Sequence, residues 1–491
     1  MTFSHALNLI DAYKLGHKDQ YPEGTEIVYS NWTARGSRVS GVDKVVFFGL
    51  QYFLDKYLGE VWGEFFDGDI DEISAEYERR VNGYLGPDNN IGSQHIRDLH
   101  SLGYLPLRFK ALPEGSLVPT RVPMLTVENT DERFAWLVNY LETLMSCILW
   151  MPSTSATISR RMRGLLDDWA AKTGTPAESV NFQGHDFSFR GMAGLEAAEL
   201  SGMGHLVNFL GTDTIPAVDA IERYYPTDEW IAGSVPATEH SVMCAGGQDD
   251  ETETYNRLLD IYPNGILSVV SDTWDLWKVL TETVPSLKDK ILARDGKLVI
   301  RPDSGDPADI LCGTNAHSME PGRENNTPAQ KGVVQLLWET FGGTVTETGH
   351  KLLDSHIGVI YGDSINYDRA NDICERLAEK GFASGNVVMG MGSYGYQYNT
   401  RDTFMFAMKA TWVKIAGEGK PIFKKPVTDS GVKNSLRGRI AVLRNLETGE
   451  LYAVDDASAW AEKESLLTTV WEDGKFVKRY SFDEVRANAR A

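Results

Sequence analysis

Between about residues 180 and 400 the chain repeats one pattern: a short apolar run, then a polar residue beside Gly, Ser or Thr, then a helical stretch. The apolar runs are Leu206–Leu210, Leu267–Val270, Leu298–Ile300, Gly358–Tyr361 and Asn386–Met389. Such continuous runs are typical of strands buried on both faces, which favours a parallel sheet. The carboxylates that follow them recur at one or two times the ~30 residues of a strand–helix–strand unit.

The clearest unit runs from Gly358 to Met389. Between its two strands, one helix face is predicted for Ala370, Ile373, Cys374, Leu377 and Ala378. We expect Gly381 to end that helix, and we expect Asp306 and Pro307 to start the helix after the Leu298 run. Each turn brings its polar residue to the carboxyl edge of the sheet, where barrels and doubly wound sheets bind ligands.

The flanks indicate antiparallel structure. Short β-like runs lie among prolines at residues 104–128, and two hairpins are predicted at Arg439–Val454 and Val470–Val477. A capping box starts a last helix at Ser481. We expect an α/β protein with an irregular parallel barrel (residues 151–400) and a β-rich α+β domain, built from residues 1–150 and 401–491. The polar segment 313–330 is either a tolerated insertion or a lid, and insertion is favoured.

The composition argues against several classes of protein. Lys and Arg number 48 against 69 Asp and Glu, a net charge of -21, so a nucleic-acid partner is not expected. The four cysteines lie far apart without Cys-x-x-Cys spacing, which suggests neither a disulfide framework nor a zinc site and favours a reducing compartment. No uninterrupted apolar stretch reaches the length of a membrane span. The chain is expected to be a cytoplasmic protein without a membrane partner.

The segment Arg301-Pro302-Asp303-Ser304-Gly305 suits a sugar phosphate. Arg can bind phosphate with two hydrogen bonds, the carboxylate can accept ribose hydroxyls, and the turn precedes a helix N-terminus. The alternative is an Arg–Asp ion pair that closes a strand. Glycine-lined turns at Gly362 and at Gly390–Ser393 support the phosphate interpretation.

Two further segments could carry chemistry. Phe187 could stack on a flat ring while Arg190 holds a phosphate, although ordinary core packing would also explain Phe187. His240, beside Glu239, could act as a base or nucleophile, although a structural histidine is the commoner case. Serine hydrolysis is not favoured, since a Gly-x-Ser-x-Gly elbow is missing around Ser234 and Ser271.

Ordered motifs along nearly the whole chain resemble the nicotinamide phosphoribosyltransferases. They include Asp11-Ala12-Tyr13-Lys14, His185-Asp186-Phe187, Phe189-Arg190-Gly191, Gly211-Thr212-Asp213-Thr214, Glu239-His240-Ser241, Val269-Val270-Ser271-Asp272, Ile300-Arg301-Pro302-Asp303-Ser304-Gly305 and Thr400-Arg401-Asp402. The resemblance implies a pentosyltransferase of NAD salvage that joins nicotinamide to phosphoribosyl pyrophosphate. It also implies a homodimer with shared active sites, Mg²⁺ held mainly by pyrophosphate and water, and ATP hydrolysis through a phosphohistidine.

The resemblance also implies residue roles. Phe187 and the partner's Tyr13 would sandwich the pyridine ring, Asp213 would accept from the carboxamide with Ser271 and Arg301 nearby, and Asp11 would come from the partner subunit. Phosphates would be bound by Arg35, Arg190, Arg301 and Arg401, with Gly392 and Ser393 at the 5′-phosphate. Asp303 and Asp363, after Gly362, would hold the ribose hydroxyls. His240 would be phosphorylated, supported by Glu239 and Asp275.

A carboxylate at position 213 favours nicotinamide, because its amide can donate, whereas nicotinate would bring a second negative charge. The chain departs from the family at Ser364, Ser393 and Tyr394, where glycine is usual, so their side chains could narrow the phosphate pocket. A nicotinate-preferring enzyme and a non-catalytic relative are the alternatives. The joint presence of Arg301, Asp303, Asp363 and His240 disfavours the second.

Overall fold

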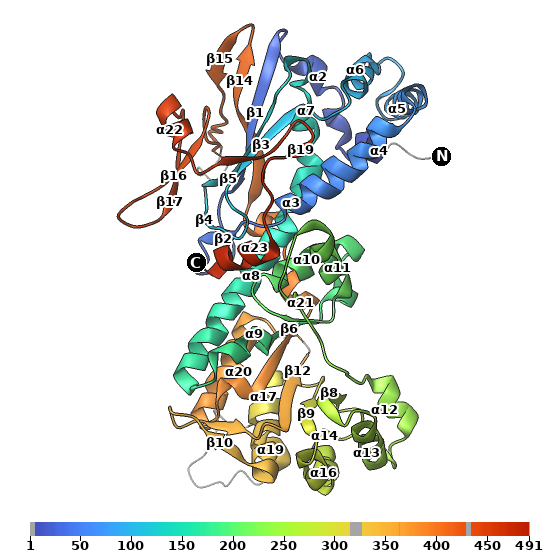
Figure 1. Ribbon diagram of the computed structural model, residues 1–491, viewed down its shortest axis with the longest axis vertical. Helices are drawn as coiled ribbons and strands as arrows, with labels where there is room; N and C mark the ends of the chain where they lie inside the picture. Colours follow the sequence, from blue (N-terminus) through green and yellow to red (C-terminus); the bar gives the residue numbers. More distant parts are fainter. Residues whose placement is uncertain (1–4, 315–326, 363, 429–433, 491) are drawn as a thin grey trace. The chain divides into compact units, whose positions relative to one another are not determined.

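The computed structural model describes residues 5–314, 327–362, 364–428 and 434–490. The chain forms two compact units (Figure 1). Unit 1 contains residues 1–157, 219–229 and 399–491, and unit 2 contains residues 158–218 and 230–398. The unit boundaries at 157 and 398 lie close to the expected 150 and 400, whereas the sequence did not indicate that residues 219–229 belong to the terminal unit.

Unit 1 is built on an antiparallel sheet with strands from both ends of the chain. Its order is β15 (Glu418–Pro421), β14 (Phe406–Ile415), β1 (Thr25–Ala34), β5 (Pro123–Asn129), β3 (Leu107–Ala111), β18 (Thr468–Glu472) and β19 (Lys475–Phe476). Two smaller antiparallel pairs are β2 (Lys44–Val46) with β4 (Leu117–Pro119), and β16 (Ala441–Arg444) with β17 (Leu451–Val454). The expected β-rich domain and both hairpins are therefore confirmed.

The helices of unit 1 are mostly short. They are α1 (His5–Asn8), α2 (His17–Gln20), α3 (Leu50–Phe53), α4 (Trp62–Asp67), α5 (Ile70–Leu85), α6 (Gln94–Leu102), α7 (Leu137–Tyr140), α22 (Ala459–Lys463) and α23 (Phe482–Arg490). The Ser481 hydroxyl accepts from Glu484 N and the Glu484 carboxylate accepts from Ser481 N, which confirms the predicted capping box. The long helix α8 (Glu142–Thr173) belongs to unit 1 up to residue 157 and to unit 2 beyond it.

Unit 2 contains a parallel sheet in the order β7 (Gly211–Thr212), β6 (Gly184–Asp186), β13 (Val387–Met391), β12 (Ile357–Tyr361), β9 (Asp295–Arg301) and β8 (Asn264–Val270). Residues 233–237 join its two edge strands, because Gly233 pairs in parallel with Gly211 and Ala237 pairs in parallel with Ser268. This segment turns the sheet into an irregular barrel, as the sequence predicted.

Helices of unit 2 include α9 (Val180–Gln183), α10 (Leu195–Leu206), α12 (His240–Gly246), α13 (Glu251–Ile261), α14 (Leu276–Lys278), α15 (Val284–Ser286), α16 (Lys288–Leu292), α17 (Pro307–Cys312), α18 (Pro328–Lys331), α19 (Val333–Phe341), α20 (Tyr367–Glu379) and α21 (Ser393–Tyr396). Helix α11 (Ile215–Tyr224) runs from unit 2 into unit 1, and the pair β10 (Gly343–Val345) and β11 (Lys351–Leu353) is antiparallel. The predicted Asp306 cap and the Gly381 helix end are both present.

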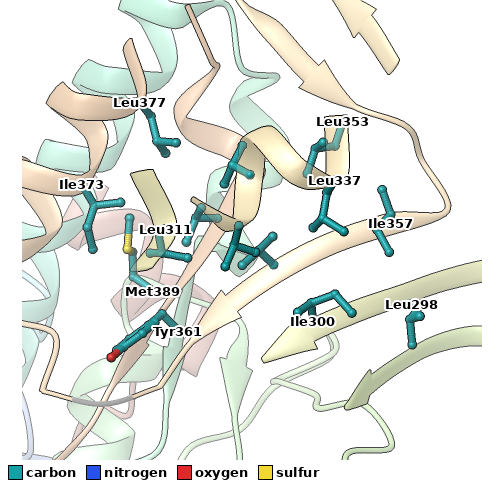
Figure 2. Packing of buried hydrophobic residues seen from close by; sticks show 14 of the residues in the cluster. Leu298, Ile300, Leu311, Leu337, Leu353, Ile357, Tyr361, Ile373, Leu377 and Met389 are labelled. Atoms are coloured by element: carbon teal, nitrogen blue, oxygen red, sulfur yellow. The ribbon is translucent and has the colours of Figure 1, made fainter. Parts of the chain in front are cut away.

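The barrel strands send alternate side chains to opposite sides. Leu298 and Ile300 of β9 pack into a buried core with Leu311 of α17, Leu337 of α19 and Ile373 of α20 (Figure 2). The residues between them on β9 line a cavity on the other side of the strand. The period of two therefore makes one apolar strand serve both the core and the interior of the barrel.

One predicted strand is wrong. Leu206 is the last residue of α10, and the strand β7 begins only at Gly211. Residues 200–206 of α10 are all buried, and the helix does not separate apolar and polar residues into two faces that would have marked its end as helical.

The ends of the 313–330 segment lie together, since Thr314 N donates to the Ala329 carbonyl. Its middle, residues 315–326, lies outside the described residues.

In the described chain, no single helix is long and apolar enough to cross a membrane. The helical residues 132–140 and the helix α8 reach that length and apolarity only together, and a bend of 46° separates them.

Candidate active site

A cavity of about 380 Å³ lies inside the barrel. It is lined by alternate residues of the strands, which include Lys297, Val299 and Arg301 on β9 and Ile266 and Ser268 on β8. The remaining lining includes His185, Phe187, Asp213, Ser234, Trp230 and Val388. The cavity thus combines flat aromatic and aliphatic walls with a few polar groups, which is the usual composition of a small-molecule site.

Asp213 is the most constrained carboxylate of this cavity. Its Oδ1 accepts from His185 Nε2 at 2.9 Å and from the Ser234 hydroxyl. Burial alone would raise the pKa of Asp213, but these two hydrogen bonds and the charge of Arg301 outweigh burial and lower the pKa below its ordinary value. Asp213 is therefore an ionised acceptor held at a fixed place in the cavity wall.

Phe187 follows β6 and forms part of the same wall. Its ring lies 4.6 Å from the His185 ring, centroid to centroid, and its backbone N–H donates to the Met391 carbonyl. A Cβ at Gly390 would lie 2.8 Å from this ring and 2.5 Å from Gly362 Cα. The glycines thus let two neighbouring strands approach the ring closely. Phe187 is a cavity residue and not ordinary core packing.

Arg301 brings a positive charge to the end of β9. Its Nη2 donates to the Thr238 carbonyl at 2.8 Å, and its Nε is buried without a hydrogen-bond partner among the described residues. The alternative interpretation of this segment was an ion pair between Arg301 and Asp303 that closes the strand. The described residues contain no such ion pair. This guanidinium N–H is a donor that a bound anion or carbonyl oxygen could satisfy.

His240 stands at the start of α12 between two carboxylates. Its Nε2 lies 3.8 Å from Asp303 Oδ2 and 3.9 Å from Asp272 Oδ1, and its Nδ1 lies 3.2 Å from the Thr273 hydroxyl. The side chain is about half exposed. It therefore offers a nitrogen to solvent or to a ligand while carboxylates surround it.

The carboxylates named for His240 by resemblance are engaged elsewhere. Asp275 accepts from Trp277 N and Lys278 N and so caps α14, and Glu239 accepts from the Ser241 hydroxyl. Asp272, to which the sequence assigned no role, also lies beside His240. Asp272 Oδ2 accepts from Asp303 N, and its buried Oδ1 has no hydrogen-bond partner among the described residues.

The turn after β13 carries Gly392 and Ser393 at the start of α21. It lies against Gly191 of the short 3₁₀ turn Phe189–Gly191, where a Cβ would come within 2.1 Å of Ser393 Oγ. Arg190 is exposed. The turns that follow the neighbouring strands β6 and β13 therefore bring the segment with Arg190 close to Gly392 and Ser393.

The turn after β12 is described only in part. Gly362 lies near Asp303, because a Cβ there would be 3.3 Å from Asp303 Oδ1, whereas Asp363 is outside the described residues. Ser364 has φ of 56°, in the left-handed region. Glycine is favoured there for conformational reasons, so serine at 364 carries a backbone cost beyond any effect on the pocket.

Ser271 does not lie where it was expected. Its side chain is fully buried, accepts from the Tyr255 hydroxyl at 2.9 Å and donates to the Val269 carbonyl at 2.7 Å. Ser268 and Ser234 are the serines that line the cavity. The strand alternation explains the difference, because Ser268 is in phase with Ile266 on the inner side of β8.

The remaining predicted residues belong to unit 1. Tyr13 is 65% exposed, and Asp11 Oδ2 accepts from the Thr143 hydroxyl. Arg401 is exposed and pairs with Asp402 at 3.2 Å. Tyr13 and Arg401 thus leave most of their surface open.

Arg35 lines a cavity of about 170 Å³ in unit 1 together with Arg121 and Lys409, which the sequence did not single out. Burial lowers the pKa of Lys409, Glu142 opposes that shift, and the charge of Arg35 adds to it. The three cations make this cavity suitable for an anion.

A metal site formed by the protein alone is not present in the described part of the chain, where three or more His, Cys, Asp or Glu side chains are nowhere grouped to hold an ion. Cys147, Cys244, Cys312 and Cys374 are all thiols and form no disulfide.

Comparison with known proteins identifies the family of this chain. The nicotinate phosphoribosyltransferase (NAPRTase) family model matches residues 182–475, and the nicotinamide phosphoribosyltransferase N-terminal domain model matches residues 5–106. A nicotinamide phosphoribosyltransferase of Acinetobacter baylyi is 50% identical over 98% of this chain and 96% of its own length. The corresponding protein of Xanthomonas campestris is 36% identical over 98% and 97%.

Solved structures support the fold. A nicotinate-nucleotide pyrophosphorylase from Pyrococcus furiosus has a TM-score of 0.61 at 16% identity, covering 99% of this chain and 95% of its own. Human nicotinic acid phosphoribosyltransferase has a TM-score of 0.54 at 18% identity, covering 98% and 92%. On the strength of the family models and the full-length relatives, the chain belongs to the nicotinamide phosphoribosyltransferases within the nicotinate phosphoribosyltransferase family.

Proposed function

We propose that this enzyme transfers the phosphoribosyl group of phosphoribosyl pyrophosphate to nicotinamide, giving nicotinamide mononucleotide and pyrophosphate. The observation that carries the proposal is the ionised Asp213, held by His185 and Ser234 in a cavity that Phe187 and Arg301 also line. The curated relatives bear the name of this activity.

The reaction balances without an external base. The bond between C1′ of the ribose and the pyrophosphate oxygen breaks, and its electron pair leaves with pyrophosphate. The lone pair of the nicotinamide ring nitrogen forms the new C1′–N bond. Because positive charge develops on the sugar and negative charge on the leaving group, the enzyme must clamp the ribose and stabilise the phosphates.

In this proposal, Asp213 accepts from the carboxamide NH₂ and Phe187 stacks on the pyridine ring. Arg190, Gly392 and Ser393 bind the 5′-phosphate. Asp303 holds the ribose hydroxyls together with Asp363, and Arg301 donates its free Nε–H to a substrate oxygen. Mg²⁺ would supply positive charge to the pyrophosphate. Among the described residues, the carboxylates closest to His240 are Asp272 and Asp303.

We further propose a homodimer in which Asp11, Tyr13, Arg35 and Arg401 complete the active site of the other protomer. The exposure of Tyr13 and the cations around Arg35 support this role, since both features suit a partner or an anion. Tyr13 of the partner subunit would cover the second face of the pyridine ring.

ATP coupling is assigned to His240. The γ-phosphate would transfer to an imidazole nitrogen as ADP leaves, and water would later cleave the N–P bond to release phosphate. The half-exposed ring between Asp272 and Asp303 suits this role, because carboxylates orient the imidazole and stabilise its positive charge.

Nicotinate phosphoribosyl transfer is the second candidate, favoured by the family model that matches most of unit 2. It is disfavoured by Asp213, since nicotinate would place a second carboxylate against an ionised one. Mass spectrometry of purified enzyme with each pyridine, phosphoribosyl pyrophosphate and Mg²⁺, with and without ATP, tests the proposal. Nicotinamide mononucleotide formation that ATP stimulates is expected, and its absence would refute the function.

A further inference from the structure

His205 is a buried histidine that the proposed reaction does not use. It lies on α10, is fully buried, and its ring stacks on Phe209 with 5.1 Å between ring centroids. Its Nε2 lies 3.0 Å from the Gly211 carbonyl and its Nδ1 lies 2.6 Å from the Tyr396 hydroxyl. Both ring nitrogens therefore have partners, and these partners belong to two different elements of the barrel rim.

The hydrogen-bond directions follow from the chemistry of the partners. A carbonyl oxygen can only accept, so His205 Nε2 carries the proton, and Nδ1 accepts from the Tyr396 hydroxyl. Burial lowers the pKa of His205 to about 4, which keeps the ring neutral near pH 7. Burial likewise raises the pKa of Tyr396, so its hydroxyl keeps its proton. The chain Tyr396–His205–Gly211 is thus fixed in one direction.

The two ends of this hydrogen-bond chain are attached to opposite parts of the substrate site. Tyr396 is the last residue of α21, which begins at Ser393 in the turn assigned to the 5′-phosphate. Gly211 starts β7, which ends one residue before Asp213. The Thr212 hydroxyl and Asp213 N also donate to Asp186, which precedes Phe187.

We infer that His205 is a positioning residue that fixes the distance between the phosphate turn of α21 and the carboxamide acceptor after β7. The inference rests on the proposed function, because it assigns the two turns to the two substrates. Without this connection, each substrate would still bind at the turn assigned to it. The alignment of the ring nitrogen with C1′ would then be lost, and such misplacement slows the chemical step.

The test compares wild type with Tyr396→Phe, which removes the hydroxyl and keeps the ring. Tyr398→Phe is the matched control, since Tyr398 is in the same segment and 77% exposed. We expect kcat of Tyr396→Phe to fall about 10-fold while both KM values stay within about twofold of wild type. We also expect His205→Gln and the double variant to lower kcat no further than the stronger single change.

A purely structural role would give a different result. Tyr396→Phe would then lower Tm, but kcat per folded molecule would match wild type, and the inference would be refuted. A rise in only one KM at unchanged kcat would also refute it, since His205 would then serve one substrate alone. Absence of product from wild type would overturn the proposed function and this inference with it, whereas active wild type with an equally active variant would overturn the inference alone.

Discussion

His185 Nε2 lies 2.9 Å from Asp213 Oδ1, although 28 positions separate the two residues in the chain. The contact arises because β6 and β7 are neighbours in the parallel sheet and pair His185 with Gly211. The carboxylate that follows β7 is thereby held beside the imidazole. The specificity of the site for an amide, in our account, depends on this register.

Phe187 should contribute to nicotinamide binding through its ring face. Replacement of Phe187 by Ala is expected to raise KM for nicotinamide about 10-fold, because a stacking surface is lost. KM for phosphoribosyl pyrophosphate should change little. Steady-state kinetics with each substrate varied measures both values, and Phe187→Leu, which restores bulk without a ring, should fall between wild type and Ala. Equal KM for nicotinamide in all three proteins would contradict the stacking role.

Gly390 should tolerate no side chain. A Cβ there would lie 2.5 Å from Gly362 Cα and 2.8 Å from both the Phe187 ring and the Tyr361 carbonyl. Because two of these neighbours are backbone atoms, β12 and β13 would have to separate. We expect Gly390→Ala to lower Tm and to abolish most activity. Gly83→Ala, in α5 with open space around its Cβ, is the control and should be neutral or stabilising.

His240→Ala is expected to remove ATP hydrolysis and the stimulation of transfer by ATP while slow basal transfer remains. Phosphate release from ATP and mononucleotide formation are measured in parallel. His356→Ala is the matched control, since His356 also pairs with a carboxylate, at 2.7 Å from Asp354, but is not assigned to the site. If His240→Ala hydrolysed ATP at the wild-type rate, a phosphohistidine at this position would be excluded.

Glu114 links stability to pH. Its carboxylate is fully buried and accepts from Gly49 N, Gln51 N and the Tyr225 hydroxyl, at the start of α3. Burial raises its pKa from 4.5 to about 7 despite these hydrogen bonds. Between these two values the folded protein keeps a proton that the unfolded chain has lost. The contribution of Glu114 to the free energy of unfolding is therefore fully present below pH 4.5 and falls as pH rises toward 7.

Glu114→Gln should remove this dependence. Between pH 5 and pH 8, the free energy of unfolding of the variant is expected to rise relative to wild type by about 3 kcal/mol at most. Denaturant melts at several pH values measure the difference, with exposed Glu447→Gln as control. A difference that stays constant with pH would contradict a protonated Glu114 in the folded protein.

The parallel strands β8, β9, β12 and β13 could be predicted because each is a buried apolar run followed by a polar turn. The strands β8, β9 and β12 begin one to three residues before the predicted runs, whereas β13 begins one residue later and ends two residues later than predicted. β7 could not be predicted, because it has only two residues and follows a helix whose apolar and polar residues are not separated into two faces. The closure of the barrel by residues 233–237 rests on isolated bridges, which leave no periodic signal.

A site residue could be predicted where it directly follows a strand. It was harder to predict where the direction of its side chain decides whether it reaches the cavity. Arg301 and Asp213 follow from their positions after apolar runs or beside them. The choice between Ser268 and Ser271 depends on which side of β8 faces the cavity, and two serines in one short run could not settle it. Asp272 belongs to a recognised motif, but only the fold brings it to within 3.9 Å of His240.

The central claim is that Asp213 makes the site select an amide, and competition between nicotinamide and nicotinate for phosphoribosyl pyrophosphate tests it most directly. Mass spectrometry of the two mononucleotides from an equimolar mixture gives the ratio of kcat/KM values. We predict that nicotinamide mononucleotide predominates by at least about 10-fold with wild type and that Asp213→Asn erodes this preference. Equal amounts of both products from wild type, or an unchanged ratio in the variant, would contradict the account.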